Sequence, residues 1–242
     1  MQIEYIYGMH AVKAVLQNRP QIVKTLYLPN KKNEMFEIAS NLNISIKLLS
    51  KSELDSLLPN ANHQGIAAEI LADSNLTYNE LDLQIFLDNI VGQPFLLILD
   101  GVQDPHNLGA CMRVANASGV HAVIVPKDRA VSLTPTVHKV ASGASLVTPL
   151  FQITNLARTI KMLKDHDFWI YGCDAEATTS IYKTDFKGKI AIVLGSEHDG
   201  LRRLTRELCD FLVSIPMFGT VSSLNVGVAA GICLFEAVRQ RI

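Results

Sequence analysis

The chain has 242 residues and 48% of them are hydrophobic, which is enough for a sizeable core and excludes a wholly disordered protein. The formal net charge of −1 excludes a global basic field, so any nucleic-acid-binding surface must be a local patch. The four cysteines are scattered without a CxxC spacing, so neither a zinc site nor a disulfide framework is expected.

The start of the chain lacks a basic region followed by an apolar stretch, so we expect no signal peptide. No apolar run reaches the roughly 20 residues that a membrane-spanning helix needs. A cytoplasmic protein is therefore expected.

Residues 1–72 are expected to form a small α/β domain, because short helical and strand-like patterns alternate there. Ser50 precedes the third helical pattern, where a side-chain oxygen can accept the first backbone N–H groups. The expected helices cover residues 10–16, 34–42 and 51–57, and the expected strands cover residues 25–28, 45–49 and 66–71.

Residues 73–92 are expected to form a linker, which contains acidic side chains and no lysine or arginine. Its second half predicts a short helix over residues 80–89.

Residues 93–242 alternate apolar strand runs with helical patterns, which predicts a mostly parallel sheet covered by helices on both faces. The patterns alone predict an α/β doubly wound fold, since true knots are nearly absent from proteins. The expected strands cover residues 95–99, 122–125, 146–150, 168–172, 191–194 and 211–215, and the expected helices cover residues 108–118, 136–142, 156–164, 201–209 and 226–241.

Three short segments each follow a strand run, which is where open α/β sheets hold their ligands. The first, residues 104–109, reads Asp-Pro-His-Asn-Leu-Gly. Asn107 is expected to cap the helix that follows, because asparagine favours that position. Arg113 lies six residues later, near the same face of the helix, and taken alone it would be a solvated charge.

The second segment, residues 195–200, reads Gly-Ser-Glu-His-Asp-Gly. It is not a Walker loop, because Leu201 and not lysine follows the last glycine. It is not a dinucleotide fingerprint either, because the GxGxxG spacing is absent. Without further context, Glu197 is an acidic side chain in the first turn of the next helix.

The third segment, Ile-Pro-Met-Phe-Gly at residues 215–219, leads into Ser-Ser-Leu-Asn at residues 222–225 and the last helix. Ser222 or Ser223 is expected to cap that helix. Glycine in a helix costs about 1 kcal/mol relative to alanine, so the small residues here predict close packing against a loop or a second copy. These small residues are Gly227, Ala229, Ala230 and Gly231.

Together and in this order, the three segments resemble the motifs of the SpoU (also called TrmH) family of RNA ribose 2′-O-methyltransferases. Residues 7–12, 62–69 and 231–241 extend the resemblance over nearly the whole chain, toward the members that act on a guanosine of 23S rRNA in the peptidyl-transferase centre. The resemblance implies an N-terminal RNA-binding domain and a C-terminal trefoil-knotted (SPOUT-type) catalytic domain over residues 93–242. It also implies a homodimer built through the catalytic domain.

The resemblance further implies S-adenosylmethionine as methyl donor, with no metal. His198 stands where family members often carry glycine. The catalytic positions that the resemblance implies are Asn107, Arg113, Glu197, Ser223 and Asn225. The donor-binding positions that it implies are Gly195, Ile215, Met217, Gly219 and Leu224.

The family proposal makes the arginine at the Arg113 position the base that removes the hydroxyl proton. A guanidinium stays protonated in proteins, and a neighbouring phosphate favours the charged form further. We therefore expect Arg113 to hold the target phosphate and orient the 2′-hydroxyl, while solvent or another group accepts the proton.

Three alternatives stay open from the sequence. A transfer RNA 2′-O-methyltransferase of the same family would keep this chemistry and change the substrate. A non-catalytic RNA-binding homologue would have lost donor binding. A nucleotide-dependent enzyme of ordinary doubly wound type would lack the knot.

Overall fold

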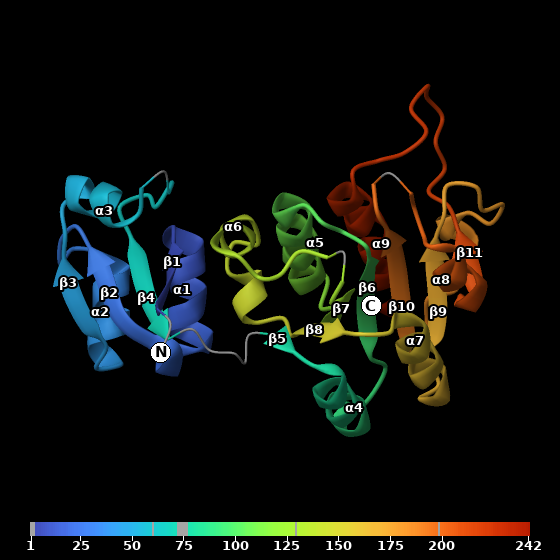
Figure 1. The fold of residues 1–242 in the computed structure, drawn as a ribbon, viewed down its shortest axis with the longest axis horizontal. Helices are drawn as coiled ribbons and strands as arrows, with labels where there is room; N and C mark the ends of the chain where they lie inside the picture. The colour runs from blue at the N-terminus through green and yellow to red at the C-terminus, as the bar shows by residue number, and fades with distance from the viewer. Residues whose placement is uncertain (1–2, 60, 72–76, 129, 198) are drawn as a thin grey trace. The chain divides into compact units, whose positions relative to one another are not determined.

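The structure is a computed structural model that describes residues 3–59, 61–71, 77–128, 130–197 and 199–242 (Figure 1). The chain divides into two compact units, Met1–Leu76 with Leu133–Val147, and Thr77–Ser132 with Thr148–Ile242. Residues 73–76 of the expected linker, and the backbone at His198, lie outside the described residues. The predicted domain boundaries stay a prediction.

The first unit contains a four-stranded sheet in the order β1-β4-β2-β3. Strand β4 pairs antiparallel with β1 and β2, and β2 pairs parallel with β3. Its strands are β1 (Ile3–Tyr7), β2 (Val23–Leu28), β3 (Ser45–Leu48) and β4 (Ala67–Leu71). Its helices are α1 (Met9–Asn18), η1 (Pro20–Ile22), α2 (Glu34–Asn41), α3 (Lys51–Leu57), α6 (Pro135–Val140) and η3 (Ala144–Leu146).

The cap predicted for α3 is confirmed. Ser50 Oγ accepts a hydrogen bond from the Glu53 backbone N–H, and the Glu53 carboxylate accepts one from the Ser50 backbone N–H at 2.7 Å. This reciprocal pair satisfies two N–H groups that have no partner inside the helix. The sequence patterns missed β1, which completes the sheet beside β4.

The second unit contains a seven-stranded sheet in the order β11-β9-β10-β6-β7-β8-β5. Every pairing among its described strands is parallel, which confirms the predicted sheet. Its strands are β5 (Thr77–Tyr78), β6 (Phe95–Asp100), β7 (Ala122–Pro126), β8 (Leu150–Ile153), β9 (Trp169–Cys173), β10 (Ile190–Gly195) and β11 (Phe211–Val213). Its helices are α4 (Glu80–Asn89), α5 (Pro105–Ala117), α7 (Leu156–Asp165), η4 (Ile181–Lys183), α8 (Arg203–Leu208) and α9 (Val226–Arg241).

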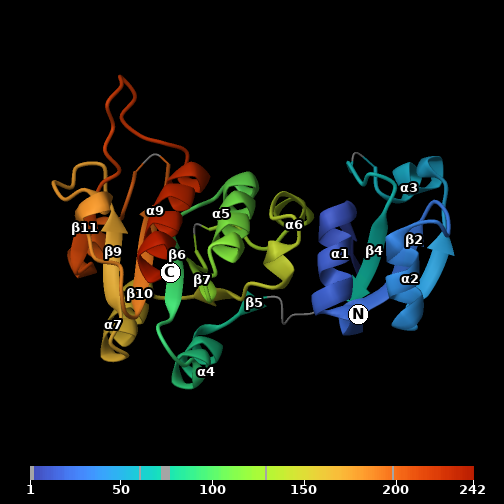
Figure 2. The same cartoon turned by 180° about the vertical axis from the view of Figure 1, so that it is seen from behind.

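Helices cover both faces of this sheet, so all six side chains of the central strand β6 are buried. Leu96 and Ile98 of β6 share one core with Leu83 of α4 and Ile160 of α7. Helices α5 and α9 pack against each other, and Figure 2 shows them side by side in front of the sheet.

The strand predicted over residues 146–150 is wrong. Ala144–Leu146 form the 3₁₀ turn η3, and Leu146 joins the core of the first unit. Strand β8 begins only at Leu150. A short apolar run does not reveal which of its residues will pair with a neighbouring strand.

Gly227 of the last helix is closely packed against helix α5 of the same chain, while the predicted packing against a loop or a second copy stays a prediction. A Cβ atom on this glycine would lie 2.9 Å from Ala110 Cβ of α5, nearer than side chains normally approach. The two small residues therefore let the backbones of α5 and α9 come together. In the part of the chain that the structure describes, no helix is long and apolar enough to span a membrane.

Candidate functional site

Three of the five predicted catalytic residues lie where β6 and β10 end and where α5 and α9 begin. Asp100, the last residue of β6, pairs in register with Gly195, the last residue of β10. Asn107 follows in the first turn of α5, and Asn225 stands at the start of α9. The carboxyl edge of the parallel sheet therefore carries the site, as open α/β folds require.

Asn107, Glu197 and Asn225 form one hydrogen-bonded chain. Asn225 Nδ2 donates to Asn107 Oδ1 at 2.8 Å, and Asn107 Nδ2 donates to the Glu197 carboxylate. Asn225 Oδ1 accepts from the Gly227 backbone N–H at 2.9 Å. The Gly227 N–H can only donate, which fixes Oδ1 of Asn225 toward it, and the Glu197 carboxylate can only accept, which fixes Nδ2 of Asn107 toward it. The side-chain amides of Asn107 and Asn225 therefore each have one orientation.

The two predicted helix caps at this site are wrong. Asp104 caps α5 by accepting from the His106 N–H at 2.9 Å, and Pro105 occupies the first helical position, where its missing N–H does no harm. Asn225, and neither Ser222 nor Ser223, caps α9. With Asp104 as the cap, the Asn107 amide is free to bridge Glu197 and Asn225.

Two predicted catalytic residues stand apart from this chain of hydrogen bonds. The Arg113 side chain is exposed on α5, and no described residue forms a hydrogen bond or ion pair with it. Ser223 is exposed and lines the cavity described next. The structure thus brings three of the five predicted positions into contact and leaves one guanidinium open to a ligand.

A cavity of about 550 Å³ lies beside the network, within the size range of small-molecule sites. Glu197 belongs both to its wall and to the hydrogen-bonded network. Of the predicted donor-binding residues, Gly219 is absent from the lining. The others, Gly195, Ile215, Met217 and Leu224, all line the cavity.

Gly195 is required by the loop that closes one side of this cavity. A Cβ atom at this position would lie 2.0 Å from the carbonyl carbon of Gly200. The loop folds back because the backbone groups of Ser196 and Gly200 exchange two hydrogen bonds, at 3.0 and 3.1 Å. Gly200 itself has a φ of +64°, a conformation that glycine adopts without strain.

An ion pair that the sequence patterns missed holds the end of the same loop. The Asp100 carboxylate is fully buried and accepts hydrogen bonds from Arg202 Nε at 2.5 Å and from the Arg202 backbone N–H at 3.2 Å. The Arg202 side chain is 46% exposed. The only signal in the sequence was an acidic residue at the end of an otherwise apolar strand.

The lining of the cavity contains a second ion pair. Arg206 Nε lies 2.8 Å from the Asp174 carboxylate, and Glu176 lies 3.5 Å from Arg206 Nη1. Below the network, burial and then the nearby Glu197 charge raise the pKa of Cys111 to about 12, so this thiol stays protonated. All four cysteines are free, and the described residues contain no cluster of three metal-ligating side chains.

Two family models match the chain. Residues 94–235 match the SpoU rRNA Methylase family, and residues 5–75 match the family described as RNA 2′-O ribose methyltransferase substrate binding. The matches fall on the two parts that the sequence analysis separates.

Curated relatives align over nearly their whole length. The 23S rRNA (guanosine-2′-O-)-methyltransferase RlmB of Vibrio cholerae is 51% identical, with 100% of this chain and 99% of the relative covered. The enzyme of the same name from Escherichia coli K12 is 49% identical, with coverage of 98% and 99%.

Among solved structures, the SpoU methyltransferase AviRb from Streptomyces viridochromogenes, crystallised with the cofactor AdoMet, superposes with a TM-score of 0.80 at 23% identity. The superposition covers 99% of this chain and 90% of AviRb. It shows that the two chains share a fold.

Proposed function

Because the chain belongs to the SpoU rRNA methylase family, we propose that it transfers a methyl group from S-adenosylmethionine to a guanosine 2′-hydroxyl in 23S rRNA. The observation that carries the proposal is that Glu197 belongs to two features at once, the cavity and the hydrogen-bonded network. This carboxylate is part of the wall of the 550 Å³ cavity and is held by the Asn107–Asn225 network. A donor site and a polar site for the acceptor thus meet at one residue.

The cavity fits the methyl donor in size and in chemistry. Apolar side chains of Ile215 and Leu224 can cover an adenosine, and Gly195 lines the same cavity. The carboxylates of Glu197 and Asp199 line the same space and favour a positively charged ligand. S-adenosylmethionine supplies an electrophilic methyl group on a positively charged sulfur.

The chain's own residues position the acceptor. The Arg113 guanidinium has free N–H groups in a planar fork, which suits the phosphate beside the target ribose. The network of Asn107 and Asn225 holds Glu197 in place and presents polar groups to the ribose, with Ser223 nearby on the cavity wall. In-line displacement depends mainly on such alignment. Solvent or another group accepts the proton.

The N-terminal unit is proposed to select ribosomal RNA. The match of residues 5–75 to a substrate-binding family supports this role. RNA loops are recognised through unstacked bases and backbone shape, which a separate domain can contact outside the reacting nucleotide.

We further propose a cytoplasmic homodimer that assembles through the catalytic domain, with the last helix threaded to form the trefoil knot. On α9, the large apolar side chains of Val228 and Phe235 are 52% and 49% exposed, and their spacing of seven residues places them on one face of the helix. A second copy covering these two side chains would remove that exposure.

The test is methyl incorporation from tritiated S-adenosylmethionine into unmodified 23S rRNA, with transfer RNA as the competing substrate. We expect incorporation into 23S rRNA only. Incorporation into transfer RNA alone would support the alternative substrate, and binding of RNA without donor binding would support the non-catalytic alternative.

Arg113 variants test the orienting role in the same assay. Arg113→Ala removes the charge and the fork, and Arg113→Lys keeps the charge without the fork. We expect both to lose most activity. If Arg113→Lys transfers methyl groups at the full rate with a shifted pH profile, Arg113 does not act by orienting the phosphate.

A further inference from the structure

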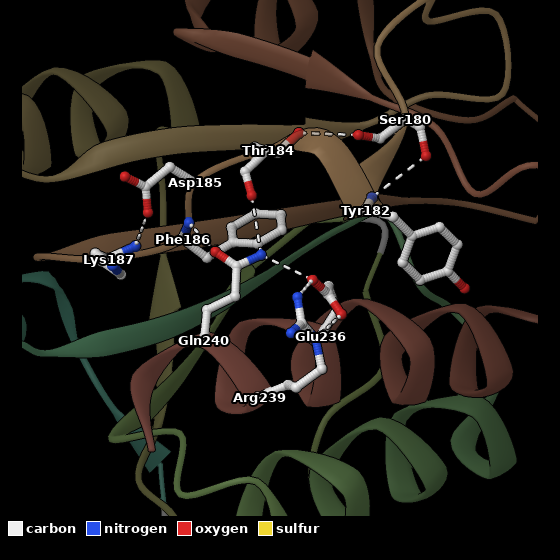
Figure 3. A network of polar contacts seen from close by, with 9 residues as sticks. All are labelled: Ser180, Tyr182, Thr184, Asp185, Phe186, Lys187, Glu236, Arg239 and Gln240. Carbon is white, nitrogen blue, oxygen red and sulfur yellow. Dashed lines mark hydrogen bonds and ion pairs between the residues drawn. The ribbon is translucent and has the colours of Figure 1, made fainter.

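A second hollow, of about 470 Å³, lies between the connection from β9 to β10 and the C-terminal end of α9. We call it the η4–α9 hollow. Figure 3 shows the network of polar contacts beneath it. Its lining consists of Tyr182, Lys183, Thr184, Asp185, Lys187, Arg239 and Gln240.

Gln240 holds the floor of the hollow in one conformation. Its Nε2 donates to the Thr184 carbonyl at 2.9 Å and to the Glu236 carboxylate at 2.7 Å, while its Oε1 accepts from the Phe186 N–H at 2.9 Å. Glu236 also accepts two hydrogen bonds from the Arg239 guanidinium, at 2.9 and 2.8 Å. The amide of Gln240 and the carboxylate of Glu236 therefore have all their polar atoms partnered.

Arg241 ties the same connection to α9 from the other side. Its Nη1 donates to the carbonyl groups of Phe186 and Gly188, at 3.2 and 3.0 Å. The backbone of residues 184–188 is thus fixed at four groups by the last turn of α9. Because this backbone is already fixed, a ligand that binds the surface loses little free energy to ordering the protein.

Most of the groups that line this hollow and face solvent are basic or aromatic, and the exposed carboxylate of Asp185 accepts a hydrogen bond from the Lys187 backbone N–H at 3.1 Å. Lys183 and Lys187 are exposed, and neither has an ion-pair partner among the described residues. The Arg239 side chain is 66% exposed and keeps Nη1 free beyond its two bonds to Glu236. Tyr182 is 56% exposed, and its ring lies outside the network in Figure 3.

A flat aromatic ring beside several cations is the pattern that binds single-stranded nucleic acid. The ring stacks on a base, and the cations contact the phosphates on either side of it. The chain as a whole carries a net charge of −1, so this concentration of cations is local.

We propose that the η4–α9 hollow binds an unpaired segment of the rRNA substrate away from the target nucleotide. Tyr182 stacks on a base, and Lys183, Lys187 and Arg239 contact the adjoining phosphodiesters. The inference rests on the proposed function, which supplies the RNA. It adds a substrate-contacting surface in the catalytic unit to the one proposed for the N-terminal unit.

The position of the hollow sets how far this contact lies from the reaction. Asn225 caps α9, and Arg239 lies 14 residues further along the same helix. At about 1.5 Å per residue, the two positions are roughly 21 Å apart along the helix axis. The contact therefore changes how RNA is held and leaves the reacting groups untouched.

The test measures binding of a 23S rRNA fragment by fluorescence anisotropy at several salt concentrations. For Lys183→Ala/Lys187→Ala we expect weaker binding and a slope of log K against log [salt] that is smaller by about 1.4, for two lost phosphate contacts. For Tyr182→Ala we expect a loss of roughly 5- to 150-fold, and for Tyr182→Phe, which keeps the ring, binding close to that of the unchanged protein.

Lys161→Ala is the matched control, because Lys161 is exposed on α7, which packs on the opposite face of the sheet from α9. In methyl transfer, the Lys183/Lys187 and Tyr182→Ala variants should raise KM for RNA and leave kcat and donor affinity unchanged. If they bind and methylate RNA like the Lys161→Ala control, this inference fails while the proposed function stands. If the unchanged protein binds no RNA, both fail.

Discussion

The pair formed by Asp100 and Arg202 gives the sharpest prediction about the donor site. It fastens the end of the loop that follows β10, in which residues 195–197 and 199–201 line the cavity. Arg202→Ala removes the guanidinium and leaves the fully buried Asp100 carboxylate with one backbone N–H donor. Asp100→Asn removes the charge and turns an N–H group toward a donor.

The size of the effect follows from burial. Removing one partner of a fully buried ion pair costs about 3–5 kcal/mol, and the half-exposed Arg202 side chain reduces our expectation to about 2–3 kcal/mol. Asp100→Asn should cost a similar amount, about 1.5–3 kcal/mol, because it loses hydrogen bonds to a charged group. The adjacent loop then samples other positions, and donor affinity should fall by about tenfold or more, equivalent to about 1.4 kcal/mol.

The neighbouring Arg203 provides the matched control. Its side chain is 87% exposed and pairs with Glu207 on the surface of α8 at 3.1 Å. Arg203→Ala should change stability by less than about 0.5 kcal/mol. Urea unfolding gives the stability differences, and calorimetry gives the affinity for S-adenosylmethionine. If Arg202→Ala costs no more than Arg203→Ala and binds donor equally well, the pair does not hold the loop.

Three further predictions concern the same unit. Gly195→Ala should abolish donor binding, since its Cβ would stand 2.0 Å from Gly200, and calorimetry that finds normal affinity would refute this. Asn225→Asp should keep the cap of α9 but lose the hydrogen bond donated to Asn107. We therefore expect kcat to fall roughly 10²-fold while the free energy of unfolding stays unchanged. A variant that loses stability along with kcat would contradict a positioning role for the network. Hydrogen bonds from Arg239 lower the pKa of Glu236 from 4.5 to about 2, so the stability that this carboxylate contributes is present above about pH 4.5 and is lost as pH falls toward 2. In Glu236→Gln, the urea midpoint of unfolding should depend less on pH over this range. If its pH dependence equals that of the unchanged protein, Glu236 does not contribute in this way.

The parallel sheet was predictable because its strands are buried on both faces and read as continuous apolar runs. Strand β6, with six buried side chains, is the clearest example. The order of the seven strands was not predictable, because the sequence of a strand does not show which strand it pairs with. The edge strand β5 was not predictable either, because its two residues, Thr77–Tyr78, are too few to form a recognisable pattern.

The helix caps show a different limit. Several neighbouring residues at each helix start are of types that cap helices well, so propensity alone could not choose among them. They are Asp104 and Asn107 before α5, and Ser222, Ser223 and Asn225 before α9. The structure assigns the caps to Asp104 and Asn225, and tertiary contacts with Glu197 then define what Asn107 does. Side chains that satisfy both a local and a distant partner are beyond sequence reasoning.

The sequence motifs predicted the candidate site, but they did not predict the ion pair between Asp100 and Arg202 that holds its loop. Four of the five residues predicted to bind the donor line the cavity, whereas Gly219 does not. The bond between Asp100 and Arg202 joins residues 102 positions apart, and no local pattern relates them.

The decisive experiment is to incubate the purified protein with S-adenosylmethionine and unmodified 23S rRNA, and to locate the methyl group by mass spectrometry of nuclease fragments. We expect a single 2′-O-methylguanosine, which is absent when Arg113→Ala or Gly195→Ala replaces the unchanged protein. Methylation on a base, on another nucleotide, or at full yield with Gly195→Ala would contradict this expectation.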